Sequence, residues 1–191
     1  MDATLRRFLT DLHDEGRRLD EHEPDRQRRR RNLEPDAAAW LWWHVQAVAA
    51  TRVVEIGTSN GYSTIWLADA VGRTGGRLTS VDVADQTEAR GNLDRAGVTA
   101  ELVTADGGAW LGACPPGSVD LLFLDAERSR YAGWWPAIRT ALRPGGSLVV
   151  DNAVSHVEQV APLAELLRAE PGWATALVPL GKGQLVSVAA R

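Results

Sequence analysis

The sequence alternates short apolar segments with stretches of helical periodicity, and this alternation limits the fold more than any other feature. The apolar segments lie at residues 52–56, 77–83, 100–104, 119–124, 147–151, 174–179 and 184–189. Helical stretches lie between the first six, at about 62–71, 85–96, 107–113, 129–142 and 156–169. The alternation predicts an α/β fold with a mostly parallel sheet covered by helices on both faces. Only Gly181-Lys182-Gly183 separates the last two strands, a spacing that permits a hairpin, so we expect an antiparallel terminal strand.

The N-terminal residues differ in composition from the rest of the chain. We expect residues 1–34 to form a helical appendage and residues 35–191 to form one domain. Apolar residues at helical spacing predict an amphipathic helix over residues 3–15. A second helix, rich in alanine and tryptophan, is expected over residues 36–50, because the proline that precedes it suits a helix start.

Composition and charge exclude several classes of function. The net charge of −4 argues against a general binder of nucleic acid or of anionic membranes. The run Arg28-Arg29-Arg30-Arg31 is interpreted as an ion-paired, solvated face, since residues 1–36 hold nine arginines and ten acidic residues. The single cysteine, Cys114, excludes an intramolecular disulfide, a cysteine-rich zinc site and a redox pair. With neither a membrane-spanning apolar run nor a secretory signal, a cytoplasmic protein is expected.

The segment Val53–Thr64 is the most informative motif. A predicted strand runs into a turn that contains Gly57 and Gly61, and a helix follows. Glycine lets the backbone approach a ligand, and the free N–H groups of the new helix favour an anion. The spacing G-x-x-x-G is neither the dinucleotide fingerprint nor a P-loop, so a carboxylate fits better than a pyrophosphate. An ordinary strand–turn–helix connection that binds nothing is the alternative.

Acidic residues end the next two predicted strands. Asp82 follows Gly57 by 25 residues, and a carboxylate there can accept hydrogen bonds from a ribose diol, although a simple turn aspartate is the alternative. Asp106 and the N–H groups beside it, including that of Gly107, are placed to recognise an adenine edge. Since ligands of open α/β sheets bind at the carboxyl ends of the strands, the three elements together match S-adenosylmethionine.

At E-I-G-T-x-x-G-Y-S, from Glu55 to Ser63, the sequence resembles class I S-adenosylmethionine-dependent methyltransferases. It is most similar to the small O-methyltransferases related to catechol and caffeoyl-CoA O-methyltransferase, over about residues 35–191. The resemblance implies a Rossmann-like sheet of seven strands in the order 3-2-1-4-5-7-6, with strand seven antiparallel. It also implies a site in which the methionine part lies among Glu55, Gly57, Gly61, Tyr62 and Ser63, the ribose on Asp82, and the adenine beside Asp106.

Three oxygen-bearing residues end the fourth and fifth predicted strands. Asp125, Asp151 and Asn152 are expected at the same sheet edge, where two carboxylates and an amide oxygen suit a divalent cation such as Mg²⁺. In the resembling O-methyltransferases, the matching D-A-D-K-x-x-Y and D-N motifs hold a divalent metal. The alternative is that both acids are solvated strand ends and that the asparagine only shapes a turn.

The residue that would accept the substrate proton differs between this sequence and the resembling family. Arg128 stands where the resembling enzymes have a lysine, and arginine stays protonated, so it can only stabilise an oxyanion or pair with a substrate carboxylate. His156 is the candidate base, with a polar helix-start residue as its alternative. Lys182 is expected to be solvated, and His44 to be packed or hydrogen-bonded.

The expected reaction is direct displacement, in which a small-molecule hydroxyl attacks the sulfonium methyl group. Trp40, Trp42, Trp43, Trp134 and Trp135 would serve the cofactor or an aromatic acceptor, or would simply pack in the core or at an interface. Three alternatives stay open: a metal-free amine or carboxylate acceptor, which Arg128 favours, a non-catalytic nucleoside-binding protein, and, more remotely, a nicotinamide dehydrogenase that lacks the third fingerprint glycine. The resemblance also implies a homodimer.

Overall fold

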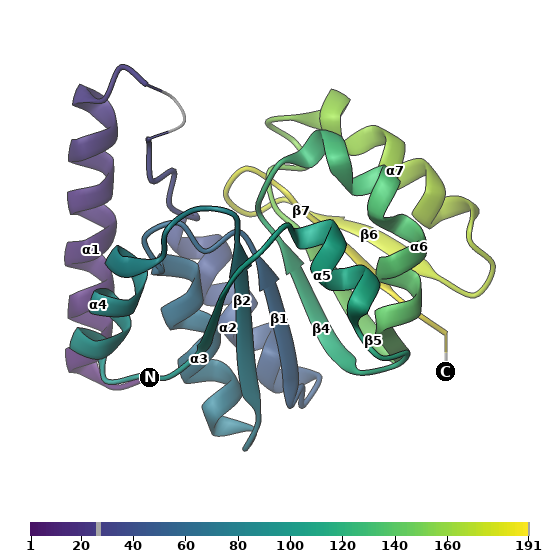
Figure 1. The fold of residues 1–191 in the computed structure, drawn as a ribbon, viewed down its shortest axis with the longest axis horizontal. Helices are drawn as coiled ribbons and strands as arrows, with labels where there is room; N and C mark the ends of the chain where they lie inside the picture. The colour runs from purple at the N-terminus through teal and green to yellow at the C-terminus, as the bar shows by residue number, and fades with distance from the viewer. Residues whose placement is uncertain (26–27, 191) are drawn as a thin grey trace.

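One sheet of seven strands forms the centre of the computed structural model, which describes residues 1–25 and 28–190 (Figure 1). The strands are β1 (Arg52–Ile56), β2 (Arg77–Asp82), β3 (Glu101–Thr104), β4 (Val119–Leu124), β5 (Leu142–Val150), β6 (Ala174–Val178) and β7 (Gln184–Val188). Their order is β3-β2-β1-β4-β5-β7-β6, and β7 runs antiparallel to both of its neighbours. The expected fold class, strand order and antiparallel terminal strand are therefore confirmed.

Helices cover both faces of the sheet (Figure 1). One face carries α1 (Ala3–His22), α2 (Pro35–Ala47), α3 (Tyr62–Arg73) and α4 (Thr87–Ala96). The other face carries α5 (Gly107–Ala113), α6 (Tyr131–Ala141) and α7 (Val157–Ala169), with the short 3₁₀ helix η1 (Arg128–Arg130) before α6. None of the helices in these described ranges is long and apolar enough to cross a membrane.

The central strands explain why the chain needs both helical layers. All six residues of β4 are buried. Leu121 and Phe123 belong to the core beneath α2 and α3, whereas Leu122 and Leu124 belong to the core beneath α6 and α7. Successive side chains of a strand point to opposite faces, so a strand that is apolar throughout must be covered on both sides.

Two helix ends differ from the expected positions. α1 continues to His22 instead of ending near residue 15, because Gly16 lies within the helix and packs against Asn32. A Cβ at Gly16 would lie 2.5 Å from the Asn32 side-chain nitrogen, so glycine here serves close packing rather than helix termination. α2 ends at Ala47, three residues before the expected end, and Ala49 then adopts a left-handed backbone with φ of 50°.

The fifth strand starts earlier than expected. β5 begins at Leu142 instead of residue 147, and it includes Pro144-Gly145-Gly146, a sequence typical of a turn. Its pairing with β4 shifts register between Val119 and Leu121, and this irregularity accommodates the extra residues. The remaining elements begin and end within two residues of their expected positions.

Asp120 binds residues of neighbouring segments at the edge of the sheet opposite to the candidate site. Its carboxylate accepts hydrogen bonds from the Thr51 amide and hydroxyl, each at 2.9 Å, and from the Arg52 amide at 2.9 Å. It also lies 2.7 Å from the guanidinium groups of Arg52 and Arg143. These donors hold the pKa of Asp120 well below its usual range, against the opposing effect of burial.

We expect Asp120→Asn to destabilise the protein by about 2 kcal/mol at pH 7, since two partly exposed guanidinium groups lose their buried partner. Urea unfolding measures the loss. A carboxyl group with a lowered pKa stabilises the fold above its unfolded pKa and loses that effect on acidification, so the difference should shrink below about pH 4. Asp94→Asn, on the exposed surface of α4, is the control and should change stability by less than about 0.5 kcal/mol. An equal loss at pH 3 would contradict this account.

Candidate active site

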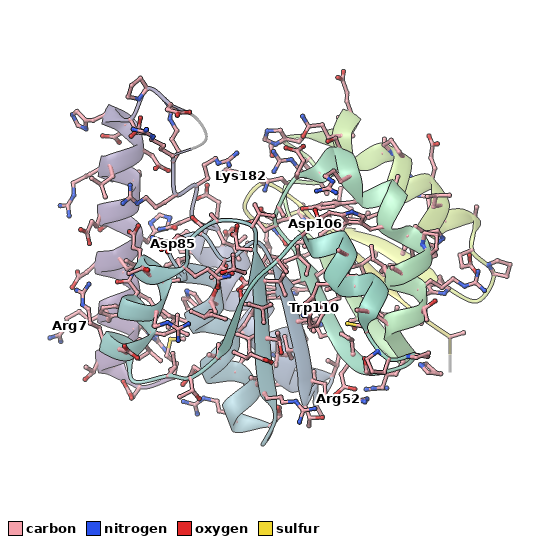
Figure 2. All side chains as sticks on the ribbon, viewed as in Figure 1. Arg7, Arg52, Asp85, Asp106, Trp110 and Lys182 are labelled. Carbon is pink, nitrogen blue, oxygen red and sulfur yellow. The ribbon has the colours of Figure 1, made fainter. Side chains whose placement is uncertain are left out.

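Backbone hydrogen bonds bring the carboxyl ends of five strands to one edge of the sheet, here called the carboxyl edge. The bonds run from Gly57 to Val81, from Ala105 to Asp82, from Asp125 to Ile56 and from Asp151 to Leu124, at 2.8–3.0 Å. Asp106 and Lys182 lie at this edge, and Arg52 lies at the opposite one (Figure 2). The predicted cofactor and metal residues that end strands are therefore gathered at one place.

The glycine turn, residues 57–61, adopts a backbone that requires glycine at both ends. Gly57 has φ of 108° and Gly61 has φ of 87°. A Cβ on Gly57 would lie 2.2 Å from the backbone oxygen of Asp125. The turn that follows β1 is thus in direct contact with the start of the loop that follows β4, so the expected cofactor and metal regions adjoin.

Asp82 lies beside the glycine turn, where a ribose-binding carboxylate is expected. One of its carboxylate oxygens accepts hydrogen bonds from the amides of Thr58 at 2.8 Å and Ser59 at 3.1 Å. The other accepts from the amide of Ala84 at 2.9 Å. An ionised carboxylate has about four acceptor positions, so Asp82 can bind the turn and still accept from a diol.

Asp106 caps the start of α5 and forms an ion pair across the carboxyl edge. Its carboxylate accepts from the Ala109 amide at 2.9 Å and lies 2.5 Å from the Arg130 guanidinium. These partners lower the pKa of Asp106. Trp134 lies below this corner, because a Cβ on Gly107 would lie 3.3 Å from its ring and Arg130 stacks 5.2 Å above its centroid. An aromatic ring and a guanidinium group thus flank the expected adenine position.

Glu55, Tyr62 and Ser63 lie beneath the glycine turn rather than open to solvent. Glu55 is fully buried and accepts hydrogen bonds from the hydroxyls of Ser63, Thr64 and Ser80, at 2.5–2.6 Å. Burial raises the pKa of Glu55 to about 7 despite these donors. Tyr62 is also buried. In this structure, the three residues support the turn from within the protein.

The buried Glu55 carboxyl predicts a pH dependence of stability. Its pKa is raised in the folded state, so the folded protein retains a proton that the unfolded chain releases between about pH 4.5 and 7. Stability should fall as pH rises through that window, by up to about 3 kcal/mol from this group. In urea unfolding at pH 4.5 and pH 7, Glu55→Gln should show a smaller fall than wild type. The control is Glu101→Gln, at an exposed position on β3, which should lose as much stability between pH 4.5 and pH 7 as wild type does. An equal loss of stability in Glu55→Gln and wild type would refute the prediction.

Asp125, Asp151 and Asn152 lie together at the carboxyl edge, as expected. The Asn152 side-chain nitrogen donates to Asp125 at 3.1 Å and to Asp151 at 2.6 Å. Gln184, at the start of β7, donates to the second Asp151 oxygen, while its own amide oxygen is buried without a hydrogen-bond partner among the described residues. Burial raises the pKa of both acids, and the charge of Asp151 raises that of Asp125 further.

The donor set of this cluster fits a hard divalent cation. Two carboxylates and one amide oxygen are the ligand types that Mg²⁺ prefers, with water or substrate oxygens completing the shell. Residues 1–25 and 28–190 contain no group of three or more His, Cys, Asp or Glu side chains that could hold a metal. The fit therefore depends on Asn152, whose amide oxygen accepts from the Ser155 hydroxyl at 3.2 Å and would have to turn toward a cation.

Arg128 and His156 lie at the rim of the cluster. The Arg128 side chain donates to Gln159 on α7 at 3.0 Å, and its positive charge moderates the raised pKa of Asp125 and Asp151. The His156 amide donates to the Asn152 carbonyl at 2.9 Å, and its ring nitrogen Nδ1 lies 2.9 Å from the Ser155 hydroxyl. Arg128 thus lies within electrostatic reach of both acids, and Ser155 links His156 to Asn152.

The other titratable candidates pack as follows. Lys182 is not simply solvated, because its ammonium pairs with Glu34 at 3.1 Å. Its backbone carbonyl accepts hydrogen bonds from Val154 and Ser155, so the β6–β7 turn borders the loop after Asn152. His44 is buried, as expected, and stacks on Trp40 at 5.0 Å; burial lowers its pKa.

The tryptophans divide between packing and exposure. Trp134 and Trp135 belong to the buried core, and Trp42 donates to Asp69 at 2.6 Å. Trp43 is 57% exposed on α2. Of the five predicted tryptophans, only Trp134 lies against a predicted cofactor residue, Gly107.

Four residues at the site escaped the sequence analysis: Ser80, Arg130, Ser155 and Gln184. Ser80 carried a weak indication, since it is a polar residue inside an apolar strand, two positions before Asp82. Gln184 meets Asp151 across 33 positions of sequence, and Arg130 meets Asp106 across 24. Such long-range partners have no local signature.

Comparisons with known proteins agree with this geometry. A family model described as a methyltransferase domain matches residues 54–153, more than half of the chain. A catechol O-methyltransferase from Niastella koreensis is 31% identical over 130 residues, which cover 64% of this chain and 58% of the relative. A catechol O-methyltransferase from Mycobacterium tuberculosis is 42% identical over 114 residues, which cover 56% and 50%. The chain thus matches only about half of the length of these relatives.

A solved O-methyltransferase from Bacillus cereus, in complex with S-adenosylhomocysteine, has the same fold. Its TM-score is 0.77 at 24% identity, and the match covers 99% of this chain and 91% of that one. The chain therefore belongs to the methyltransferase-domain family. The similarity to catechol O-methyltransferases confirms the resemblance seen at Glu55–Ser63.

Proposed function

We propose that this protein transfers the methyl group of S-adenosylmethionine to a hydroxyl group of a small molecule. The observation that carries the proposal is the convergence of three elements at the carboxyl edge. Asp82 hydrogen-bonds the glycine turn, and Gly57 of that turn contacts the backbone of Asp125. The names of the two catechol O-methyltransferase relatives and the bound product in the Bacillus cereus neighbour support the same reaction and cofactor.

In the proposed complex, each part of the cofactor has a partner of fitting chemistry. Asp82 accepts hydrogen bonds from the ribose hydroxyls, and the glycine turn lets the methionine part approach the backbone at the start of α3. The corner formed by Asp106, Gly107 and Trp134 receives the adenine. Glu55 and Ser63 hold the turn in place through the hydroxyl network beneath it.

The reaction is an in-line displacement at the methyl carbon. The acceptor oxygen forms a bond to this carbon while the carbon–sulfur bond breaks, and its electron pair stays on sulfur as S-adenosylhomocysteine leaves. Since the cofactor already carries an activated methyl group, the protein contributes mainly position and electrostatic environment. His156 accepts the hydroxyl proton, and Arg128, which stays charged, stabilises the developing oxyanion.

Asp125, Asp151 and Asn152 would hold a divalent cation such as Mg²⁺ beside the acceptor. A cation there supplies positive charge that makes an acceptor hydroxyl more acidic. The support lies in the two buried acids, whose mutual repulsion a cation would offset.

The second candidate function is methyl transfer to an amine or carboxylate without metal, which Arg128 in the place of the family lysine favours. We also expect a homodimer, and a single 20.7 kDa species in sedimentation would contradict it.

Calorimetry and activity assays test the proposal in separate steps. S-adenosylmethionine and S-adenosylhomocysteine should bind, and NADH should not; the reverse pattern would end the methyltransferase proposal. A panel of catechol acceptors, assayed with and without EDTA, tests the metal, because full activity in EDTA would remove its role. Binding of the cofactor without product from any hydroxyl, amine or carboxylate acceptor would favour a non-catalytic nucleoside-binding protein.

A further inference from the structure

A cavity of about 610 Å³ lies between α1 and the linker, defined here as residues 28–34, which leads into α2. Four cationic side chains line it: Arg17 from α1, Arg29 and Arg31 from the linker, and Lys182 from the β6–β7 turn. Three acidic side chains, Asp20, Glu21 and Glu34, line it as well, so the lining carries an excess of one positive charge.

Two of the three acidic residues that line the cavity have partners, Asp20 in the linker backbone and Glu34 in Lys182. Both carboxylate oxygens of Asp20 accept backbone N–H groups of the linker, from Arg30 at 2.7 Å and from Arg31 at 2.8 Å. Glu34 pairs with Lys182, and Glu21 is exposed. Within residues 1–25 and 28–190, the guanidinium groups of Arg17 and Arg31 form no ion pair or hydrogen bond with another side chain. Both side chains are exposed, and the charge of Arg31 also lowers the pKa of Glu127, so a ligand would share Arg31 with that carboxylate.

Two segments that line the cavity, the linker and the β6–β7 turn, contact both halves of the proposed active site. The Arg30 carbonyl accepts a hydrogen bond from the Ser59 hydroxyl of the glycine turn at 3.1 Å, so the linker rests on the expected cofactor site. Lys182 lines the cavity, and its carbonyl binds the amides of Val154 and Ser155, just after Asn152. Figure 2 shows Lys182 at the carboxyl edge. The segments that line the cavity thus contact the glycine turn and the loop after Asn152 through hydrogen bonds.

The linker is held in a strained conformation where it lines the cavity. Arg31 has φ of 49°, a left-handed backbone that is unfavourable for a non-glycine residue. The two Asp20 hydrogen bonds fix this conformation. Strain that the surrounding structure enforces in this way is concentrated at functional sites.

We propose that this cavity binds the methyl acceptor through an anionic group, a carboxylate, that pairs with Arg31 and Arg17. A guanidinium group matches a carboxylate in a bidentate pair, so the enzyme should prefer an anionic acceptor to its neutral counterpart. This inference rests on the proposed function for the methyl transfer itself, and it adds the class of acceptor.

The test compares two acceptors that share a catechol ring and differ in charge, 3,4-dihydroxybenzoate and its methyl ester. We expect wild type to have the higher kcat/KM for the acid. Arg31→Met should lower that value by about 10- to 100-fold, through loss of a charge-assisted pair, and change the ester by less than about 2-fold. Arg17→Met should act in the same direction, and Arg31→Lys should retain part of the preference. Arg7→Met, on the exposed surface of α1 (Figure 2), is the matched control for Arg17→Met and should change kcat/KM for neither acceptor.

Binding measurements separate failure of this proposal from failure of the proposed function. The S-adenosylhomocysteine-loaded protein is titrated with the acid by calorimetry, and Arg31→Met should weaken this binding while the affinity for S-adenosylhomocysteine stays constant. Equal use of acid and ester, equal losses for both in Arg31→Met, or no binding of the acid to wild type would each overturn the anionic site. Absence of any S-adenosylmethionine binding would instead overturn the methyltransferase function.

Discussion

Replacing Gly57 with alanine should abolish cofactor binding and destabilise the fold. The new Cβ would lie 2.2 Å from the backbone oxygen of Asp125, and neither backbone can move without disturbing the other. The residue also has φ of 108°, which L-residues rarely adopt. We expect the affinity for S-adenosylmethionine to fall by about 100-fold or more and the free energy of unfolding to fall by about 3 kcal/mol. Calorimetry and urea unfolding measure the two effects.

Gly75→Ala is the control for Gly57→Ala because it separates steric overlap from backbone strain. Gly75 has φ of 72°, yet a Cβ there would meet no atom within 4 Å. Its replacement should cost only about 1 kcal/mol, the strain of the left-handed backbone, and should leave cofactor affinity unchanged. If the two variants were equally stable and bound the cofactor equally well, the contact between Gly57 and Asp125 would have no importance.

Asp151→Asn should have opposite effects on activity and on stability. The substitution removes one of two buried acids that repel each other when charged, so the metal-free protein should gain stability relative to wild type as pH rises. The same change removes a carboxylate ligand of the proposed cation, so kcat should fall by about 100-fold or more. Thermal unfolding in EDTA and methyl transfer with Mg²⁺ measure the two effects, while cofactor affinity should stay unchanged.

Two controls accompany Asp151→Asn. Asp94→Asn, on the exposed surface of α4, should alter neither activity nor stability. In thermal unfolding, added Mg²⁺ should stabilise wild type more than Asp151→Asn, because a ligand that binds only the folded state raises its stability. Full activity of Asp151→Asn would exclude the proposed metal ligation, and reduced stability in EDTA would show that its hydrogen bonds outweigh the repulsion.

The sequence predicted those parts of the fold that depend on local pattern. Apolar strands such as Val119–Leu124 are unambiguous because every residue is buried, and the short Gly181-Lys182-Gly183 connection left a hairpin as the simplest path. The complete strand order came from the family resemblance rather than from periodicity. Gly16 misled the helix prediction, because a glycine that permits close packing looks the same in sequence as one that ends a helix.

The candidate site was predictable only where its residues end strands. Asp82, Asp125 and Asp151 follow apolar segments, so their common location follows from the parallel sheet. The tether from Asp20 to the linker, the pair between Lys182 and Glu34, and the contact of Gln184 with Asp151 join segments that are distant in sequence. No local pattern marks such partners, and the folded backbone alone brings them together.

The contact between Gly57 and the Asp125 backbone has a consequence for protein engineering. A chimera that takes the loop after β4 from another methyltransferase replaces the Asp125 backbone that Gly57 contacts. The new loop must still fit against Gly57, which lies 68 positions earlier in the chain, because the Asp125 carbonyl occupies the space beside this glycine. Chimeras should therefore exchange both segments as one unit.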